Sequence, residues 1–265
     1  MMIEATEFDY LFFHASMTMA CILFLNFVNL ALQSLIQRKR KTIFVTIEGN
    51  IGSGKSTLLA HLKEFFKKQK NIRIGYIDEP IDEWNEIKDS EGKTVLEKYY
   101  KEQEKYAFAF QMMAYISRLV NIKKSLNLDC DIIIMERSMI TDREVFAKML
   151  FDEKKMEDVE YTIYNKWFDA FIGELPELFY IYVKTTPEIS LKRVNTRNRQ
   201  GESSIPLDYL TKCNEYHDKW LDDIPESKIL KINADDDFDE VRYNKVCEEA
   251  FDFMKIAEKV YKFYN

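Results

Sequence analysis

One run of nine residues has the composition and spacing of a phosphate-binding loop. Its members, in order, are Gly49, Asn50, Ile51, Gly52, Ser53, Gly54, Lys55, Ser56 and Thr57. The glycines allow backbone N–H groups to point at phosphate oxygens, and the start of a following helix adds the positive end of its dipole. In this pattern the lysine reaches the β- and γ-phosphates, and the hydroxyl after it binds Mg²⁺. We therefore expect Lys55 to bind the phosphates of ATP and Ser56 to bind Mg²⁺.

Two other apolar runs are followed by charged residues that suit phosphoryl transfer. Glu79 follows the run Ile72–Asp78, and Arg137 follows Glu136 at the end of the run Asp131–Glu136. We predict Glu79 as a general base, Arg137 as a cation that stabilises the transferring phosphoryl group, and Glu136 as part of the Mg²⁺ shell. Taken alone, Glu79 would be interpreted as a loop carboxylate, so its assignment depends on the motifs around it.

Three arginines in the second half of the chain form a compact basic group. Arg193, Arg197 and Arg199 stand at positions i, i+4 and i+6 near the predicted end of a helix. At this spacing their guanidinium groups can converge on one set of phosphate oxygens. Small and polar residues follow Arg199, a composition typical of a flexible segment. The alternative interpretation is a solvated basic surface.

Five short apolar runs alternate with helical stretches and indicate the fold class. The expected strands are Thr42–Glu48, Ile72–Asp78, Asp131–Glu136, Leu178–Lys184 and Lys228–Asn233. The expected helices include Lys55–Gln69, Thr94–Leu126 and Asp237–Tyr261. Strands separated by helices predict an α/β domain with a five-stranded parallel sheet covered on both faces. Ligands of such sheets bind at the carboxyl ends of the strands, where all the motifs above are expected.

In this order the motifs resemble those of one known family. GNIGSGKST at 49–57, EPIDEW at 79–84, Phe110-Gln111, ERS at 136–138 and the late arginine-rich segment are similar to the animal-type deoxynucleoside kinases. The resemblance covers about residue 41 to the C-terminus. It implies a P-loop NTP hydrolase-type fold with an Arg-rich lid. It also implies transfer of the ATP γ-phosphate to the 5′-hydroxyl of a deoxynucleoside in nucleotide salvage, with Mg²⁺.

The same resemblance implies roles for residues around the nucleoside. Glu79 would take the proton of the 5′-hydroxyl, and Arg137 would hold both Glu79 and the reacting oxygen. Tyr100 and Glu202 would bind the sugar 3′-hydroxyl, and the amide of Gln111 would pair with the edge of the base. The other residues expected around the substrate are Ile51, Trp84, Phe110 and Phe146. Outside this motif order, the aromatic residues would be interpreted as ordinary packing residues.

On the donor side, the resemblance implies that Arg193, Arg197 and Arg199 belong to a lid that closes over ATP and excludes water. Asp235 lies in a segment that is similar to the loop around the adenine. Members of the family are commonly dimers, so the resemblance also implies a homodimer.

Two charged residues bear on the choice of nucleoside. Arg118 and Asp142 stand where family members that accept deoxycytidine or purine deoxynucleosides carry an Arg and an Asp. Such a pair fills the space that the methyl group of thymine would need. The resemblance therefore implies deoxycytidine, deoxyadenosine or deoxyguanosine as substrate, with thymidine disfavoured. The alternative is a structural salt bridge without influence on specificity.

Three other functions remain as alternatives. Thymidylate-type monophosphate kinases share the loop and the fold, but they usually carry Asp-Arg in place of Glu136-Arg137. A catalytically silent, kinase-like structural subunit is disfavoured by the intact Lys55, Ser56 and Glu79. A P-loop GTPase is disfavoured because the sequence lacks a recognisable NKxD motif.

The bulk composition disfavours several further classes of protein. Lys and Arg number 38 against 45 Asp and Glu, a net charge of −7, which argues against binding to a DNA or RNA polymer. Four scattered cysteines predict neither a disulfide framework nor a zinc site and favour a reducing, cytoplasmic location. We predict surface or packing roles for the three histidines, His14, His61 and His217.

Residues 1–40 form a hydrophobic N-terminal segment outside the predicted kinase domain, 41–265. The stretch 10–36 contains no Asp, Glu, Lys or Arg and precedes a basic run at 38–41. It is long enough to cross a bilayer, and the positive-inside rule would leave the catalytic domain on the cytosolic side. The alternatives to this membrane anchor are a non-native extension and a packed helix.

Overall fold

The structure is a computed structural model that describes residues 26, 42–199, 201–202 and 205–264. The chain divides into two compact units, Met1–Lys41 and Thr42–Asn265. The predicted membrane anchor at 10–36 lies outside the described residues, apart from Asn26. Among the described helices, none combines the length and the apolar composition needed to cross a membrane.

The second unit contains a five-stranded sheet. Its strands are β1 (Ile43–Glu48), β2 (Ile74–Ile77), β3 (Ile132–Glu136), β4 (Leu178–Lys184) and β5 (Ile229–Asn233). All neighbours pair in parallel, in the order β2-β3-β1-β4-β5. Every residue of the central strand β1 is buried, as expected for a parallel sheet covered on both faces. The predicted α/β fold and its five parallel strands are therefore confirmed.

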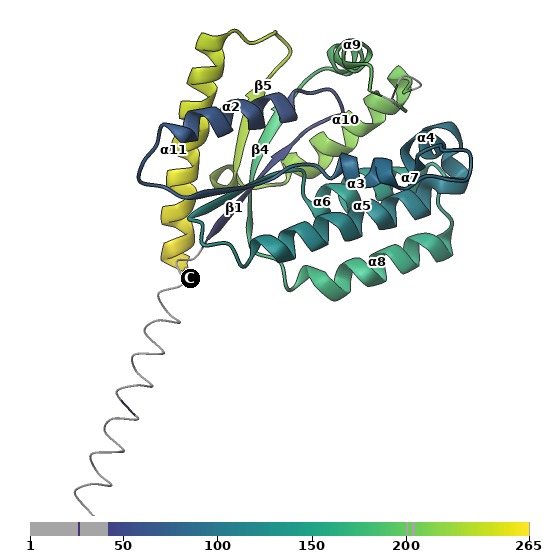
Figure 1. The fold of residues 1–265 in the computed structure, drawn as a ribbon, viewed down its shortest axis with the longest axis horizontal. Coiled ribbons are helices and arrows are strands. Elements are labelled where there is room, and N and C mark those ends of the chain that lie inside the picture. The colour runs from purple at the N-terminus through teal and green to yellow at the C-terminus, as the bar shows by residue number, and fades with distance from the viewer. Residues whose placement is uncertain (1–25, 27–41, 200, 203–204, 265) are drawn as a thin grey trace, which may run out of the picture. The chain divides into compact units, whose positions relative to one another are not determined.

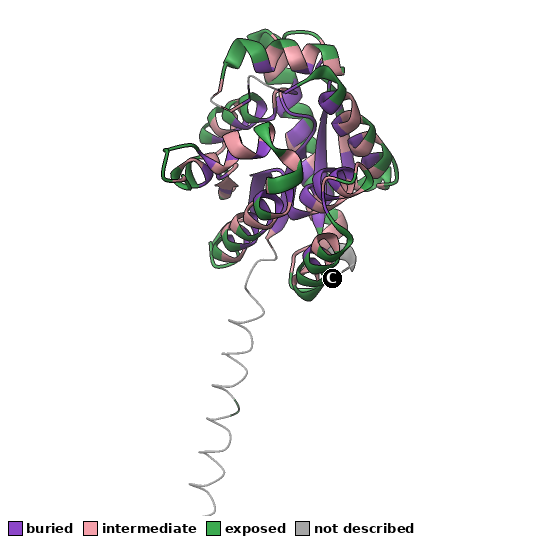
Figure 2. Ribbon diagram, turned by 90° about the vertical axis from the view of Figure 1, so that its right-hand side faces the viewer, coloured by how far each residue is buried: buried purple, intermediate pink, exposed green. Residues whose placement is uncertain are grey.

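Two layers of helices cover the sheet (Figure 1). Helices α2 (Lys55–Lys67) and α11 (Glu240–Tyr264) pack on one face, against alternate residues of β1 such as Val45. Helices α5 (Gln103–Ser125) and α8 (Asp158–Ile172) belong to the apolar cluster of the opposite face. In Figure 2 the strands lie in a buried interior, and the exposed residues lie on the outer sides of the helices.

The helix expected at Thr94–Leu126 is divided in two. Thr94 caps α4 (Val95–Lys101) by accepting a hydrogen bond from the backbone N–H of Glu97, and the Glu97 side chain completes the capping box. The backbone leaves the helical region at Glu102, with φ −138° and ψ 68°, and α5 begins at the next residue. Glycine and proline are absent at this break, so residue propensity alone could not reveal it.

The remaining elements connect strands to the site. They are α3 (Ile81–Glu86), α6 (Met139–Thr141), the π-helical segment η1 (Asp142–Ala147), α7 (Lys148–Asp152), α9 (Pro187–Arg197), α10 (Leu207–Asp222) and the 3₁₀ turn η2 (Glu226–Lys228). Strand β1 leads into the glycine-rich loop, β2 into Glu79, and β3 ends at Glu136. Because β3 pairs with both β1 and β2, the carboxyl ends of these three strands lie side by side.

Candidate active site

The glycine-rich loop between β1 and α2 has a backbone that side chains would obstruct. Gly49 and Gly52 have φ angles of 143° and 79°, in the region that favours glycine. A Cβ on Gly49 would lie 2.3 Å from the carbonyl oxygen of Val183 in β4, and one on Gly52 would lie 2.5 Å from that of Ser190 in α9. The loop thus has the close backbone packing of a phosphate cradle, as the sequence pattern predicts.

Two polar side chains at the start of α2 have defined partners. Lys55 Nζ donates to the backbone carbonyl of Asn50 over 2.7 Å, and Ser56 Oγ donates to Glu136 Oε1 over 2.7 Å. Burial, followed by the charge of Arg137, lowers the pKa of Lys55 to about 7. A hydroxyl beside a carboxylate is an oxygen ligand set that suits Mg²⁺, so Ser56 and Glu136 are the residues that could hold it.

Glu79 lies between two guanidinium groups. Its Oε1 accepts a hydrogen bond from Arg118 Nη2 over 2.7 Å and lies 3.3 Å from Arg137 Nε. Burial opposes the charge of Glu79, but the positive charges of Arg118, Arg137 and Lys55 outweigh it and lower the pKa of Glu79 to about 2. Glu79 is therefore an ionised proton acceptor at neutral pH.

Arg137 is held by backbone as well as by side-chain contacts. It has a φ angle of 62°, and its backbone N–H donates to the carbonyl oxygen of Ile47 over 3.1 Å. Its Nη1 donates to the carbonyl oxygen of Gly49 over 2.8 Å, and its guanidinium lies 5.1 Å from the ring centre of Phe146. These contacts fix one guanidinium between the phosphate cradle and Glu79.

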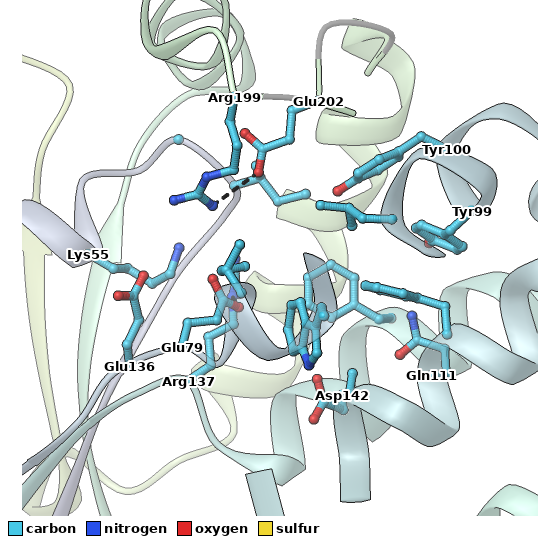
Figure 3. Close-up of a pocket in the computed structure, with 18 of the residues that line it drawn as sticks. Lys55, Glu79, Tyr99, Tyr100, Gln111, Glu136, Arg137, Asp142, Arg199 and Glu202 are labelled. Atoms are coloured by element: carbon cyan, nitrogen blue, oxygen red, sulfur yellow. Dashed lines mark hydrogen bonds and ion pairs between the residues drawn. The ribbon is translucent and has the colours of Figure 1, made fainter. Parts of the chain in front are cut away.

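A cavity that is partly open to solvent lies beside Glu79 and Arg137. Figure 3 shows Lys55 and Glu136 toward one end of it, Gln111 toward the other, and Glu79 between them. The other predicted acceptor residues in its lining are Ile51, Trp84, Tyr100, Phe110, Arg118, Arg137, Asp142, Phe146 and Glu202. The structure thus brings together every residue that the sequence suggested for the nucleoside.

Aromatic rings shape the end of this cavity that is remote from Lys55. Phe110 stacks on Tyr99, with ring centres 4.5 Å apart, and meets the edge of Trp84 at 5.5 Å. Trp84 in turn lies under the guanidinium of Arg118, at 5.3 Å. Such a group of flat, rigid side chains forms a slot suited to a planar ring.

Two buried oxygen atoms at this end have no hydrogen-bond donor among the described residues. They are Gln111 Oε1 and Asp142 Oδ2. The other oxygen of Asp142 accepts from Arg118 Nε over 3.3 Å, whereas Oδ2 is 3.0 Å from that nitrogen without hydrogen-bond geometry. Burial raises the pKa of Asp142 to about 6, against the opposing charge of Arg118. A buried acceptor without a donor favours a ligand that supplies an N–H group.

A second cavity, also partly open to solvent, lies over the glycine-rich loop and the start of α2. It shares Gly52, Lys55, Arg197 and Arg199 with the first cavity, so the two meet at these residues. The phosphate cradle therefore opens on one side toward a large cavity and on the other toward the slot with Glu79.

The other two residues predicted for ATP lie farther along this second cavity. Arg193 lines it, but its Nη1 donates to the carbonyl oxygen of Ala234 over 2.8 Å and its Nη2 lies 3.1 Å from Asp237 Oδ1. Asp235 also lines it and accepts from the backbone N–H of Thr186 over 2.6 Å. Both residues thus stabilise the 234–237 loop, and Arg193 lines the same cavity as Arg197 and Arg199 while it is bonded to this loop.

Glu202 pairs with the two arginines at the junction of the cavities. Its carboxylate forms ion pairs with Arg197 Nη2 and, over 3.3 Å, with Arg199 Nη1. Tyr100 points toward Glu202 from the opposite side of the first cavity (Figure 3). Glu202 and Tyr100 can therefore meet the same ligand atom, as expected for a shared sugar hydroxyl.

Comparison with known proteins identifies the family. A family model described as deoxynucleoside kinase matches residues 45–255. This chain belongs to the deoxynucleoside kinase family. It is 34% identical over 232 residues to a probable deoxycytidine kinase of Fowlpox virus, covering 83% of this chain and 91% of the relative. Human deoxycytidine kinase is 32% identical over 79% of this chain and 90% of its own length. Human mitochondrial thymidine kinase 2 is 28% identical over 70% of this chain and 66% of its own length.

The family settles the reaction class. The chain is an ATP-dependent deoxynucleoside kinase, and its small-molecule substrates are a deoxynucleoside and ATP. The predicted resemblance is confirmed, and the monophosphate-kinase, silent-subunit and GTPase alternatives find no support in these relatives.

Two features of this kinase site were not anticipated from sequence. Tyr99, beside the predicted Tyr100, supports Phe110 from behind, and its hydroxyl lies 2.9 Å from that of Tyr209. Glu48 is fully buried and accepts hydrogen bonds from the Ser138 N–H over 3.0 Å and from the Thr141 hydroxyl. It thus ties β1 to the turn that carries Arg137. An acidic residue at the end of an apolar strand is an available signal, because a buried charge needs partners.

Proposed function

We propose that this kinase transfers the ATP γ-phosphate to the 5′-hydroxyl of deoxycytidine, or of a purine deoxynucleoside, in preference to thymidine. The observation that carries this proposal is a pair of buried acceptors, Gln111 Oε1 and Asp142 Oδ2, that accept no hydrogen bond from the described residues, although Asp142 Oδ2 forms an ion pair with Arg118 Nε over 3.0 Å. The exocyclic amino group of cytosine or adenine, or the N–H groups of guanine, supplies donors to such atoms. Thymine instead presents a carbonyl oxygen at the position of the cytosine amine, which an ionised Asp142 repels. Relatives named deoxycytidine kinase support the same choice.

In the proposed reaction, Glu79 accepts the 5′-hydroxyl proton while that oxygen forms a bond to the γ-phosphorus. The bond from the γ-phosphorus to the bridging oxygen breaks, and ADP leaves. Arg137, 3.3 Å from Glu79, orients the carboxylate and the attacking oxygen. The sugar is held at its 3′-hydroxyl by Tyr100 and Glu202.

Cationic groups at the junction of the cavities stabilise the transferring phosphoryl group. Lys55, Arg197 and Arg199 line both cavities and provide this charge. Ser56 and Glu136 would hold Mg²⁺, which when bound neutralises charge on the β- and γ-phosphates. The ion pairs of Glu202 with both arginines support a lid that closes from this side.

The proposal extends to assembly and location. We expect a homodimer through α5 and α8, because both helices expose apolar residues, among them Ile116, Val120, Ile163 and Trp167. We also expect the kinase domain in the cytoplasm, where ATP is abundant, with residues 10–36 as a membrane anchor.

The deciding experiment measures phosphate transfer from ATP–Mg²⁺ to each of the four deoxynucleosides and, separately, to their monophosphates. We expect deoxycytidine or a purine deoxynucleoside to have the highest kcat/KM and thymidine the lowest. In Glu79→Gln, kcat should fall by roughly 10²–10⁴-fold with little change in KM, because only the proton acceptor is lost.

A matched control is Asp78→Asn, the preceding carboxylate, which pairs with Lys63 at the surface. Its kcat should equal that of the wild type. Preferred turnover of thymidine would overturn the substrate assignment, and undiminished turnover by Glu79→Gln would overturn the assignment of the base.

A further inference from the structure

His217 lies on α10, directly behind the catalytic group. It is fully buried, and its Nε2 is 3.4 Å from Arg137 Nη1, the nitrogen that also donates to Gly49. We propose that His217 is a positioning residue for phosphoryl transfer, which fixes the guanidinium of Arg137 by accepting a hydrogen bond at Nε2. This inference rests on the proposed role of Arg137 and adds a residue that does not touch substrate.

The surroundings of the ring determine which nitrogen carries its proton. Nδ1 lies 2.6 Å from the backbone carbonyl oxygen of Cys213, one turn earlier in α10. A carbonyl oxygen only accepts, so the proton is on Nδ1. Nε2 of the neutral ring therefore carries a lone pair, and this lone pair faces the N–H of Arg137.

The imidazole is also held in one orientation. It lies parallel to the ring of Tyr182, with ring centres 6.4 Å apart. It is nearly perpendicular to the ring of Phe146, with an interplanar angle of 88° and ring centres 6.3 Å apart. Phe146 contacts the other member of the pair as well, since the Arg137 guanidinium lies over its ring. His217 Nε2 is therefore fixed in position, and the guanidinium of Arg137 must align with it to donate a hydrogen bond.

The charge state of the ring suits an acceptor. Burial first, and the positive charge of Arg137 second, hold the pKa of His217 well below its usual range. Imidazole therefore stays neutral at neutral pH. An acceptor at this place matters because Arg137 Nη1 is buried and carries two N–H groups, of which one donates to the Gly49 carbonyl oxygen. Without His217 Nε2 the second N–H would be a buried donor without an acceptor, which destabilises this orientation of the guanidinium. A small rotation of the guanidinium would also break the contact between Arg137 Nε and Glu79, which is 3.3 Å long, and leave Glu79 held by Arg118 alone.

The test separates the acceptor from the ring. His217→Phe keeps an aromatic ring but removes the acceptor, whereas His217→Gln places an amide oxygen near the position of Nε2. We expect kcat of His217→Phe to fall by roughly 10–100-fold, the loss of one hydrogen bond to a charged group, with both KM values nearly unchanged. Most of this kcat should return in His217→Gln. A kcat of folded His217→Phe within twofold of the wild type would overturn the proposal, as would failure of His217→Gln to regain activity.

Two further variants complete this test. His217→Asn retains a donor toward the Cys213 carbonyl and lacks an acceptor at the Nε2 position, so it replaces the Phe variant if that protein does not fold. His61→Phe makes the same exchange on α2, where His61 stacks on Tyr243 at 3.7 Å, and should leave kcat unchanged. Thermal unfolding of each variant checks that the losses are not losses of folded protein.

Arg137→Lys distinguishes this inference from the proposed function. If Arg137→Lys retains full kcat, the catalytic role of Arg137 is wrong, whatever His217 does. If Arg137→Lys has a reduced kcat, adding His217→Phe to Arg137→Lys should lower kcat little further. Both substitutions remove the same contact, the one between residues 137 and 217. Independent, multiplicative losses would contradict the inference alone.

Discussion

Lys55 is a residue of this kinase whose pKa, shifted by burial and by neighbouring charges, lies in a pH range that is accessible to assays. In the proposed reaction its ammonium group binds phosphate as a cation, yet burial and Arg137 lower its pKa to about 7. Above that pH the neutral amine prevails in the protein without ATP. We therefore expect kcat/KM for ATP, at saturating nucleoside, to fall as pH rises from 6 to 9. A steady-state pH series with wild-type protein measures this.

The matched control for this series is Lys55→Arg. A guanidinium keeps its charge over the whole range, so the basic decline should disappear even though the altered geometry lowers activity. The titration of ATP itself is common to both proteins and cancels in the comparison. A kcat/KM for ATP that is flat in wild type, or that falls equally in Lys55→Arg, would contradict the role given to burial.

The role of a single residue could be predicted from the sequence where the residue belongs to a motif. It could not be predicted where the role depends on a tertiary contact. Glu79, Gln111 and Asp142 line one cavity, as their motifs suggested. Glu48 and His217 could not be assigned, because each acts through partners distant in sequence, at Ser138 and at Arg137. The orientation of a long side chain was equally inaccessible: Arg193 has the predicted spacing but bonds to the backbone of the 234–237 loop.

At the scale of elements, the glycine-rich loop and α9 meet backbone to backbone at Gly52. A Cβ there would lie 2.5 Å from the carbonyl oxygen of Ser190 and 2.9 Å from a methyl carbon of Val194. Gly52→Ala should therefore displace α9, which carries Arg197, and reduce kcat/KM for ATP at least about tenfold. Steady-state kinetics with ATP as the varied substrate checks this.

Gly92 provides a control with the same backbone conformation. Its φ angle is also 79°, but a Cβ there would meet no atom within 4 Å. Both alanine variants should lose about 1–2 kcal/mol of stability to the left-handed conformation. Only Gly52→Ala should in addition lose activity with ATP. Equal kinetic effects in the two variants would show that strain, and not the contact with α9, is responsible.

The elements themselves were predictable to different extents. Runs such as 132–136, Ile-Ile-Ile-Met-Glu, are typical of buried strands, and the structure has a strand there. The break at Glu102 was not visible, because the residues around it favour helix on either side. The π-helical turn at Asp142–Ala147, which directs Asp142 and Phe146 into the same cavity, likewise has no signature in residue type.

At the scale of the whole molecule, the exposed faces of α5 and α8 suggest how two copies would associate. Val159, Ile163 and Trp167 stand at i, i+4 and i+8 on α8, with exposed fractions of 67%, 38% and 51%. Ile116 and Val120, also exposed, stand at i and i+4 on the neighbouring α5. An apolar stripe of this kind on two adjacent helices is more typical of a subunit interface than of a solvated surface.

We therefore expect the wild-type protein to have the mass of two chains in sedimentation equilibrium, and Ile163→Glu/Trp167→Glu to have the mass of one. The free-energy cost of burying two carboxylates without partners would exceed the free energy gained from the remaining apolar contact. Ile256→Glu, a similar exchange at an exposed residue of α11 on the other face of the sheet, should leave the dimer intact. The monomeric variant should keep its kcat, since every residue assigned to the site comes from one chain. A wild-type monomer would refute the interface, and a monomeric variant with normal fold and no activity would mean that dimerisation supports the site.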